Sequence, residues 1–338
     1  MNKLTKIGAS ALCGSLAAVS ANAGALSVSG GADVTWISTD YAVTGNPIGI
    51  GSNMTFSGSG ELDNGSTVTL SIVHTNKAAY SATDVQWDLP GIGKLGFDQG
   101  AGGTGIDIID DKMPTAWEET TGTAVATGMN TVSGSGGHTN ISLSVSEDLL
   151  PDGLSVDLAW SPVADGSSNN DKASGSVGSA SQSGFDVVVQ HSGLYDGLNV
   201  FAGYSSIDQK DEATTTGNNT STGWGATYAV GSFTVGYQET RNSTNLREST
   251  DHYANQAYGI SFAVSDDLSL SYGQHNSERH GGMAAKSSVE MEATSLQMAY
   301  TMGGAALKIA QTSVDHGLYD SSSATDREGY TIALSLAF

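Results

Sequence analysis

Carboxylate side chains gather in one stretch of the chain, and the chemistry open to them is the attraction of cations. The acids of this stretch lie close together and have few basic neighbours. The Debye length at physiological salt is about 8 Å, so carboxylates around a narrow aqueous passage are felt across it. If this stretch borders such a passage, its charged residues are expected to form a cation-attracting constriction, and they are Asp107, Asp110, Asp111, Lys112, Glu118 and Glu119.

Two other interpretations of these acids stay open. They could be ordinary solvated loop residues, or they could hold Ca²⁺, a hard cation that prefers carboxylate oxygens. The chain contains no spaced calcium-loop motif, so we predict no metal site and no cofactor, and Ca²⁺ at the loop acids remains the alternative.

The remaining reactive side chains do not form a recognisable catalytic arrangement. Seven histidines are scattered along the chain, and a hydrolase needs a nucleophile with a base in reach. Ser133 and Ser135 precede His138, but the surrounding glycines favour a flexible segment. His275 and His280 could ligate a metal, although a polar external loop explains them better. We therefore predict that the protein is not an enzyme.

Alternating strands must position these acids. The chain ends with apolar residues at every second position from Tyr330 to Phe338, which places them on one face of a strand. In a transmembrane β-barrel such a face meets lipid. About sixteen alternating segments follow one another from Ala25 onward. The pattern predicts an all-β fold, a transmembrane antiparallel β-barrel of about 16 strands.

The connections between these segments take turns in being short and long. Short ones carry Asn, Asp and Gly, as at Asp63–Gly65, Pro151–Gly153 and Gly303–Gly304, because these residues accept the positive φ of tight hairpins. Long ones are polar, as at 167–183 and 208–221. This is the arrangement of periplasmic turns and extracellular loops.

One connection, at about 100–138, is much longer and mixes apolar residues with its acids. We predict that it folds into the lumen and narrows it, because a barrel of sixteen strands otherwise leaves a wide aqueous channel. The residues expected to pack on the wall are Ile108, Ile109, Met113 and Trp117, with the acids facing water. By alternation, the charged residues of the lumen wall are Asp33, Lys94, Asp98, Asp157, Asp186 and Lys308.

The N-terminus predicts export. Lys3 and Lys6 precede an apolar run and Ala21-Asn22-Ala23, so 1–23 is predicted to be a cleaved signal peptide and 24–338 the barrel domain. No later stretch is apolar enough for a membrane-spanning helix. The net charge of −22 repels phosphate backbones, which argues against nucleic-acid binding.

The order of these parts resembles that of the trimeric general porins of Gram-negative bacteria, in character the alphaproteobacterial type. The resemblance rests on the signal peptide, the strands, the loop inserted after the fifth strand, the hairpin Asp88–Phe97 and the terminal Phe338. It implies an outer-membrane homotrimer in contact with lipid and lipopolysaccharide. It also implies that the barrel-assembly machinery acts during biogenesis, with Phe338 as the C-terminal assembly signal.

In the porin family the inserted loop sets the narrowest point, and its acids face a basic cluster on the wall. This chain has only four arginines, at predicted loop or rim positions, so the resemblance and the charge together indicate a net negative pore. We predict a passive diffusion channel for ions and small hydrophilic solutes, with a preference for cations. The alternatives are a substrate-specific channel and a closed-lumen structural or adhesive barrel; most aromatic residues apart from Phe201 fall on the lipid-facing phase, which favours the general pore.

Overall fold

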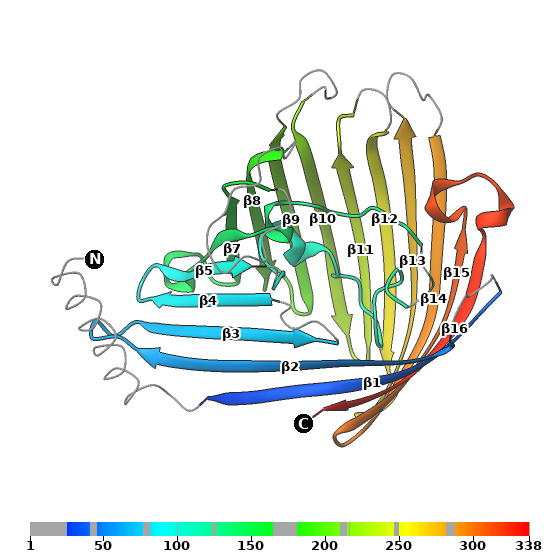
Figure 1. Ribbon diagram of the computed structural model, residues 1–338, viewed down its shortest axis with the longest axis horizontal. Coiled ribbons are helices and arrows are strands. Elements are labelled where there is room, and N and C mark those ends of the chain that lie inside the picture. The colour runs from blue at the N-terminus through cyan, green and yellow to red at the C-terminus, as the bar shows by residue number, and fades with distance from the viewer. Residues whose placement is uncertain are drawn as a thin grey trace, which may run out of the picture.

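The chain forms one closed antiparallel barrel, seen in a computed structural model (Figure 1). The structure describes residues 26–40, 46–76, 82–99, 101–123, 125, 127–164, 181–209, 215, 217–246, 250–281 and 288–337. Each strand pairs with its neighbours in sequence, and β1 pairs with β16 to close the sheet. The predicted fold class is confirmed. The predicted signal peptide and Phe338 lie outside the described residues.

Sixteen strands make up the barrel, and short 3-10 helices are the only helical elements among the described residues. The strands are β1 (Ser27–Thr39), β2 (Ile48–Glu61), β3 (Thr67–Thr75), β4 (Ala82–Leu89), β5 (Gly93–Gln99), β6 (Asn140–Val145), β7 (Leu154–Ser161), β8 (Ser181–Ser192), β9 (Leu198–Gln209), β10 (Asn219–Val230), β11 (Phe233–Ser243), β12 (Thr250–Ala263), β13 (Leu268–Gly281), β14 (Ser288–Met302), β15 (Ala305–Asp315) and β16 (Arg327–Ala337). No helix in the described part of the chain has the length and apolar character needed to span a membrane.

Tight turns join alternate strand pairs at one end of the barrel. Gly65 (φ 81°) lies between β2 and β3, Gly153 (φ 79°) between β6 and β7, and Gly303 (φ 63°) between β14 and β15. Glycine accepts this left-handed geometry without a Cβ clash. The predicted short turns are therefore confirmed, and they set the register of each hairpin. The predicted long loop 167–183 lies mostly outside the described residues.

Strict alternation separates the two faces of the sheet. At the closing pair, Val34 faces Leu334 and Trp36 faces Ile332, and all four side chains are exposed on the outer surface. Aromatic rings extend this outer belt across neighbouring strands, with Tyr237 and Tyr258 5.2 Å apart between ring centroids. Exposed apolar side chains in a continuous belt indicate contact with hydrocarbon rather than water.

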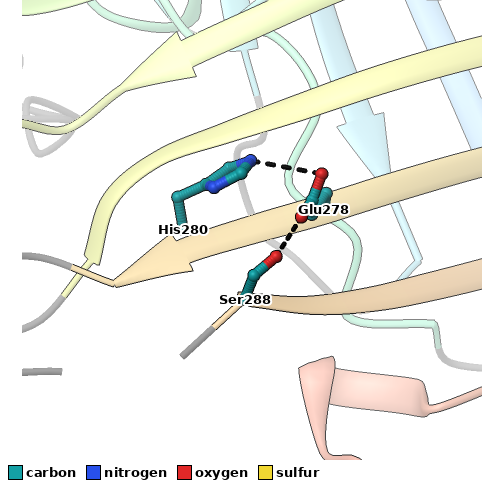
Figure 2. A network of polar contacts seen from close by, with 3 residues as sticks. All are labelled: Glu278, His280 and Ser288. Atoms are coloured by element: carbon teal, nitrogen blue, oxygen red, sulfur yellow. Dashed lines mark hydrogen bonds and ion pairs between the residues drawn. The ribbon is translucent and has the colours of Figure 1, made fainter. Parts of the chain in front are cut away.

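Charged residues replace this apolar belt toward the ends of the strands. On the outer phase of β13, Glu278 lies beyond Tyr272, and its carboxylate is 3.3 Å from Nε2 of His280 (Figure 2). Ser288, at the start of β14, donates to the same carboxylate. The polar contacts mark where the outer face of the barrel changes from apolar to hydrophilic.

The buried apolar residues in the described part of the chain form two small clusters rather than one core. One contains Ile106, Ile109, Val188 and Phe201, and the other contains Val125, Met291, Ala293, Val314 and Tyr319. Both clusters combine wall residues with residues of the long connection between β5 and β6. The packing of this barrel is therefore concentrated where that connection meets the wall.

Candidate functional site

The long connection between β5 and β6, here called the inserted segment (described residues 101–123, 125 and 127–139), follows the inner phase of the wall. It begins with the 3-10 helix η1 (Gly105–Ile109), which contacts β7 to β10, and its trace passes across the barrel (Figure 1). Side chains from successive strands then hydrogen bond to its backbone. The wall residues in these bonds are Asp186 (β8), Ser221 (β10), Gln238 (β11), Asn255 (β12), Ser271 (β13), Gln297 (β14) and Thr331 (β16).

A single buried carboxylate holds the outgoing and the returning ends of the segment. Asp186 has no exposed surface and accepts hydrogen bonds from the backbone N–H of Ile106 (3.0 Å), Ser135 (2.9 Å) and Gly136 (2.9 Å). Hydrogen bonds to a charged acceptor are stronger than neutral ones. Asp186 lies on the inner phase, as alternation predicts, but it is not a solvated wall acid. It ties together two points of the segment that are far apart in sequence.

Asp98 holds the first residues of the segment in a similar way. Its carboxylate accepts hydrogen bonds from the N–H of Ala101 (2.7 Å) and Gly102 (3.2 Å), and the Asn140 side chain lies 3.4 Å away. Asp98 is buried. Two of the charged residues predicted for the wall are thus engaged by the backbone of the segment.

The apolar residues of the segment pack on the wall less uniformly than expected. Ile109 is fully buried against Val188 and Phe201, whereas Ile108 and Met113 are only partly buried beside them. Ile106, which was not among the predicted packing residues, is as deeply buried as Ile109. Its position in a tight 3-10 helix turns both Ile106 and Ile109 to the wall, because side chains three apart share a face there.

Glycines on the inner face of the strands let the segment approach. A Cβ at Gly203 or Gly223 would lie 2.8 Å from Cδ1 of Ile109, and one at Gly259 would lie 2.9 Å from Cδ of Pro114. Gly203 and Gly223 are direct partners across β9 and β10. The missing side chains form a shallow track on the wall in which the segment rests.

Three carboxylates of the segment lie close to one another. Oxygens of Asp110, Asp111 and Glu119 fall within 4.8 Å of one another. They border a cavity of about 180 Å³ that Met113 and Trp117 also line. Carboxylate oxygens at this spacing repel one another when ionised and offer the ligands that a hard cation prefers.

Burial and mutual repulsion change how these acids titrate. Burial, followed by a hydrogen bond and charge repulsion from Asp111, raises the pKa of Glu119 to about 8. Burial, followed by the charges of Asp110 and Asp186, raises the pKa of Asp107 to about 7. The pKa of Asp110 is raised as well, chiefly by burial. Contrary to the expectation that all five loop acids face water, only Asp111 and Glu118 are exposed.

The basic residues near the segment are few. Lys308 lies on β15 with its Nζ 5.9 Å from the centroid of the Trp117 ring. Lys112 is partly buried, which lowers its pKa, while the charge of Asp157 opposes that shift. Lys94 is exposed on the inner phase of β5, opposite Asp88 of β4. None of these lysines forms an ion pair among the described residues.

The wall formed by β1 to β5 carries acids in place of a basic cluster. Asp84 of β4 lies directly opposite Asp98 of β5, and Asp33 of β1 accepts a hydrogen bond from Ser335 of β16. These five strands contain no arginine. Asp157 likewise belongs to the inner phase, on β7, and accepts from Ser144 (2.6 Å).

Sequence reasoning did not identify the glycine track or the anchoring part of Asp186. One signal was present: glycines recur inside the strands on the polar phase, where a side chain is otherwise expected. Sequence reasoning named Phe201 as the inward-facing aromatic residue. It did not identify Tyr253 and Tyr319, which also pack inside the barrel.

Comparison with known proteins identifies the fold. No protein-family model and no curated protein matches the chain. Solved structures do. A Salmonella typhi OmpF in complex with daunomycin is similar with a TM-score of 0.69 and 14% identity over 93% of this chain and 97% of that chain. An anion-selective porin from Comamonas acidovorans has a TM-score of 0.64 and 11% identity over 93% and 99% of the two chains.

A third neighbour is OmpT, an outer membrane protein of Vibrio cholerae, in its trimer form. Its TM-score is 0.65, with 11% identity over 93% of this chain and 99% of that chain. The three likenesses show that the chain has the sixteen-strand barrel fold of porins over nearly its whole length.

The comparisons correct one prediction, that the protein is not an enzyme. Several of the similar structures are of Vibrio cholerae OmpT. Their descriptions call OmpT an outer membrane protein and name no activity. A fold shared at such low identity serves many chemistries, so it does not exclude catalysis. The scattered histidines were too weak a ground for the exclusion, and we withdraw it.

Proposed function

We propose that the protein is a passive diffusion channel of the bacterial outer membrane for ions and small hydrophilic solutes. The observation that supports this most strongly is a closed barrel with an apolar outer belt and a polar inner face, across which one long segment is braced. Closure satisfies the edges of every strand in hydrocarbon, and a barrel of this strand number leaves room for water.

In this proposal the inserted segment is the constriction of the pore. It rests on the glycine track, so we place the open passage on the other side of the segment, toward the wall of β1 to β5. The charged residues of the passage are those predicted for the constriction and for the wall, except that Asp98 and Asp186 have their carboxylates in hydrogen bonds to the segment.

We infer a preference for cations from the imbalance of charge. Asp111 and Glu118 are exposed on the segment, Asp33 is exposed on the wall, and Lys94 is the exposed cation of the wall of β1 to β5. Fixed carboxylates at a narrow opening raise the local concentration of cations. The preference is moderate at neutral pH, because the raised pKa values of Asp107 and Glu119 leave part of the acids uncharged.

Trimeric assembly and lipid contacts belong to the same proposal. The Vibrio cholerae neighbour is described in a trimer form, and the barrel here shares its architecture. We propose a homotrimer whose outer belt contacts lipid and lipopolysaccharide, after assembly that uses Phe338 as its signal. The channel needs no cofactor; Ca²⁺ at Asp110, Asp111 and Glu119 is the alternative for that cluster.

Recording of single channels in a planar bilayer tests the proposal. Purified protein is expected to give stable ohmic steps, and a KCl gradient should give a reversal potential of the sign of cation preference. Absence of steps would support the closed-lumen barrel instead. A conductance blocked by one class of sugar or peptide at low concentration would support the substrate-specific channel.

A further inference from the structure

A second connection touches the inserted segment at residues 127–130, before the segment returns to Asp186. The strands β15 and β16 are joined by residues 316–326, which contain the 3-10 helix η4 (Gly317–Tyr319). The backbone N–H of Leu318 donates to the carbonyl oxygen of Thr127 at 2.9 Å. The Leu318 side chain covers Gly128, where a Cβ would lie 2.2 Å from its Cδ2. The two connections are therefore fitted to each other in backbone and in shape.

Tyr319 is the centre of this contact. Only 4% of its surface is exposed. Its hydroxyl accepts a hydrogen bond from the backbone N–H of Asn130 (2.9 Å) and lies 2.7 Å from Oγ of Ser277 on the wall. The guanidinium of Arg279 donates to the Tyr319 carbonyl oxygen (3.0 Å) and lies 5.5 Å from the ring centroid.

The ring of Tyr319 completes an apolar cluster drawn from three parts of the chain. It packs with Val125 of the inserted segment and with Met291 and Val314 of β14 and β15, all buried. Tyr253 of β12 lies against it with ring centroids 5.1 Å apart. Without this ring, water would reach the apolar contact between the segment and the wall.

The backbone around Tyr319 is held in an unfavourable conformation. His316 (φ 55°), Leu318 (φ 59°) and Tyr319 (φ 57°) all lie in the left-handed region, where a Cβ crowds the following carbonyl oxygen. Such geometry persists where the surrounding contacts over-determine it, and it is concentrated at sites under a functional constraint. Here the contacts of Tyr319 and Leu318 keep the backbone in this conformation.

We propose that residues 316–326 form a latch that fixes residues 127–130 of the inserted segment, with Tyr319 as its positioning residue. The inference rests on the proposed function, because it assigns to the latch the size and steadiness of the constriction. Asp186 holds both ends of the segment, at Ile106 and at Ser135, and the latch holds residues 127–130 between them, so that this stretch does not swing into the passage.

The test begins with Tyr319→Phe, which keeps the ring and removes only the hydroxyl. Loss of its hydrogen bonds should raise the time spent outside the main conductance level about tenfold. The heat-modifiable barrel should form as in wild type. Tyr195→Phe is the matched control, because Tyr195 is exposed in the β8–β9 turn, and it should leave the traces unchanged. Tyr319→Phe traces identical to wild type would overturn the latch.

A cysteine pair, Thr127→Cys with Leu318→Cys, tests the contact first by cross-linking and then by conductance. Its background is Cys13→Ser, which removes the one natural cysteine. Mild oxidation of the folded protein should cross-link the pair, and in the Tyr319→Phe background the cross-link should restore steady conductance until it is reduced. Failure to cross-link would overturn the latch. Absence of steps from wild type would overturn the proposed channel instead, so the two failures are distinguishable.

Discussion

The two halves of the barrel wall differ in what they offer the lumen. The half that contains β8 to β14 presents glycines and hydrogen-bonding side chains, and these hold the inserted segment. The half formed by β1 to β5 presents acids, among them Asp33 and Asp84. A wall that must hold a segment needs close approach and hydrogen bonds, whereas a wall that borders water keeps its charges. The first half holds the segment, and the second half forms the opposite wall of the proposed passage.

Removal of the buried anchor should damage the half that holds the segment most. Asp186→Ala leaves three backbone N–H groups without an acceptor, and each such group costs about 1–3 kcal/mol when buried. We expect a lower unfolding temperature and irregular conductance, measured by heat-modifiable electrophoresis and planar-bilayer recording. Asp157→Ala is the matched control, because among the described residues that inward acid accepts a hydrogen bond from Ser144 alone. Equal effects of the two variants would show that Asp186 is no more important for holding the segment than Asp157.

Filling the glycine track should produce the next largest effect. Gly259→Val places atoms where Pro114 now lies, so we expect the segment to be pushed from the wall and the single-channel conductance to fall. Gly58→Val on β2 is the comparison, because a Cβ there meets only the tip of Leu26 at 4.0 Å. An unchanged conductance for Gly259→Val would show that the track does not set the passage.

Neutralising the segment acids should change selectivity without changing the fold. One variant removes four acids of the inserted segment: Asp110→Asn, Asp111→Asn, Glu118→Gln and Glu119→Gln. Its reversal potential under a KCl gradient should move toward zero. A second variant, Asp84→Asn with Asp88→Asn, makes the corresponding change on the wall of β1 to β5. If neither variant moves the potential, the carboxylates are ordinary solvated residues.

The smallest effect is a dependence on pH. The pKa of Glu119 is about 8 and that of Asp107 about 7, so raising the pH from 6 to 9 adds negative charge to the segment and should strengthen the preference for cations. The folded protein binds these protons more tightly than the unfolded chain does. Their contribution to stability is therefore complete below the unfolded pKa and is lost as the pH rises through about 7 to 8.

The pH effect has its own control in the acids themselves. Asp107→Asn with Glu119→Gln should flatten the change in reversal potential between pH 6 and pH 9. A slope that persists in this double variant would assign the titration to other groups.

Much of the architecture was predictable from local patterns. The period of two identified the strands, and Asn, Asp and Gly located the turns, as at Gly65 and Gly153, because both signals depend only on near neighbours in sequence. The place of the inserted segment was also predictable, since alternation stops at Gln99 and resumes at Asn140.

The contacts of the inserted segment were not predictable in this way. Alternation placed Asp186 on the inner phase but could not show that Ile106 and Gly136, thirty residues apart, converge on its carboxylate. It gave equal status to Ile108 and Ile109, which a 3-10 helix then separated in burial. The raised pKa of Glu119 likewise depends on a neighbour, Asp111, that only the folding of the segment brings close.

By itself the sequence determined the barrel, its turns, its apolar belt and the excess of acids, because each follows from residue type and a period of two. Tertiary structure alone decided which acids anchor and which face the passage, and it brought Tyr319 onto residues 127–130 of the segment. The physical reason is that burial and hydrogen-bond partners are properties of the closed cylinder, in which residues distant along the chain become neighbours.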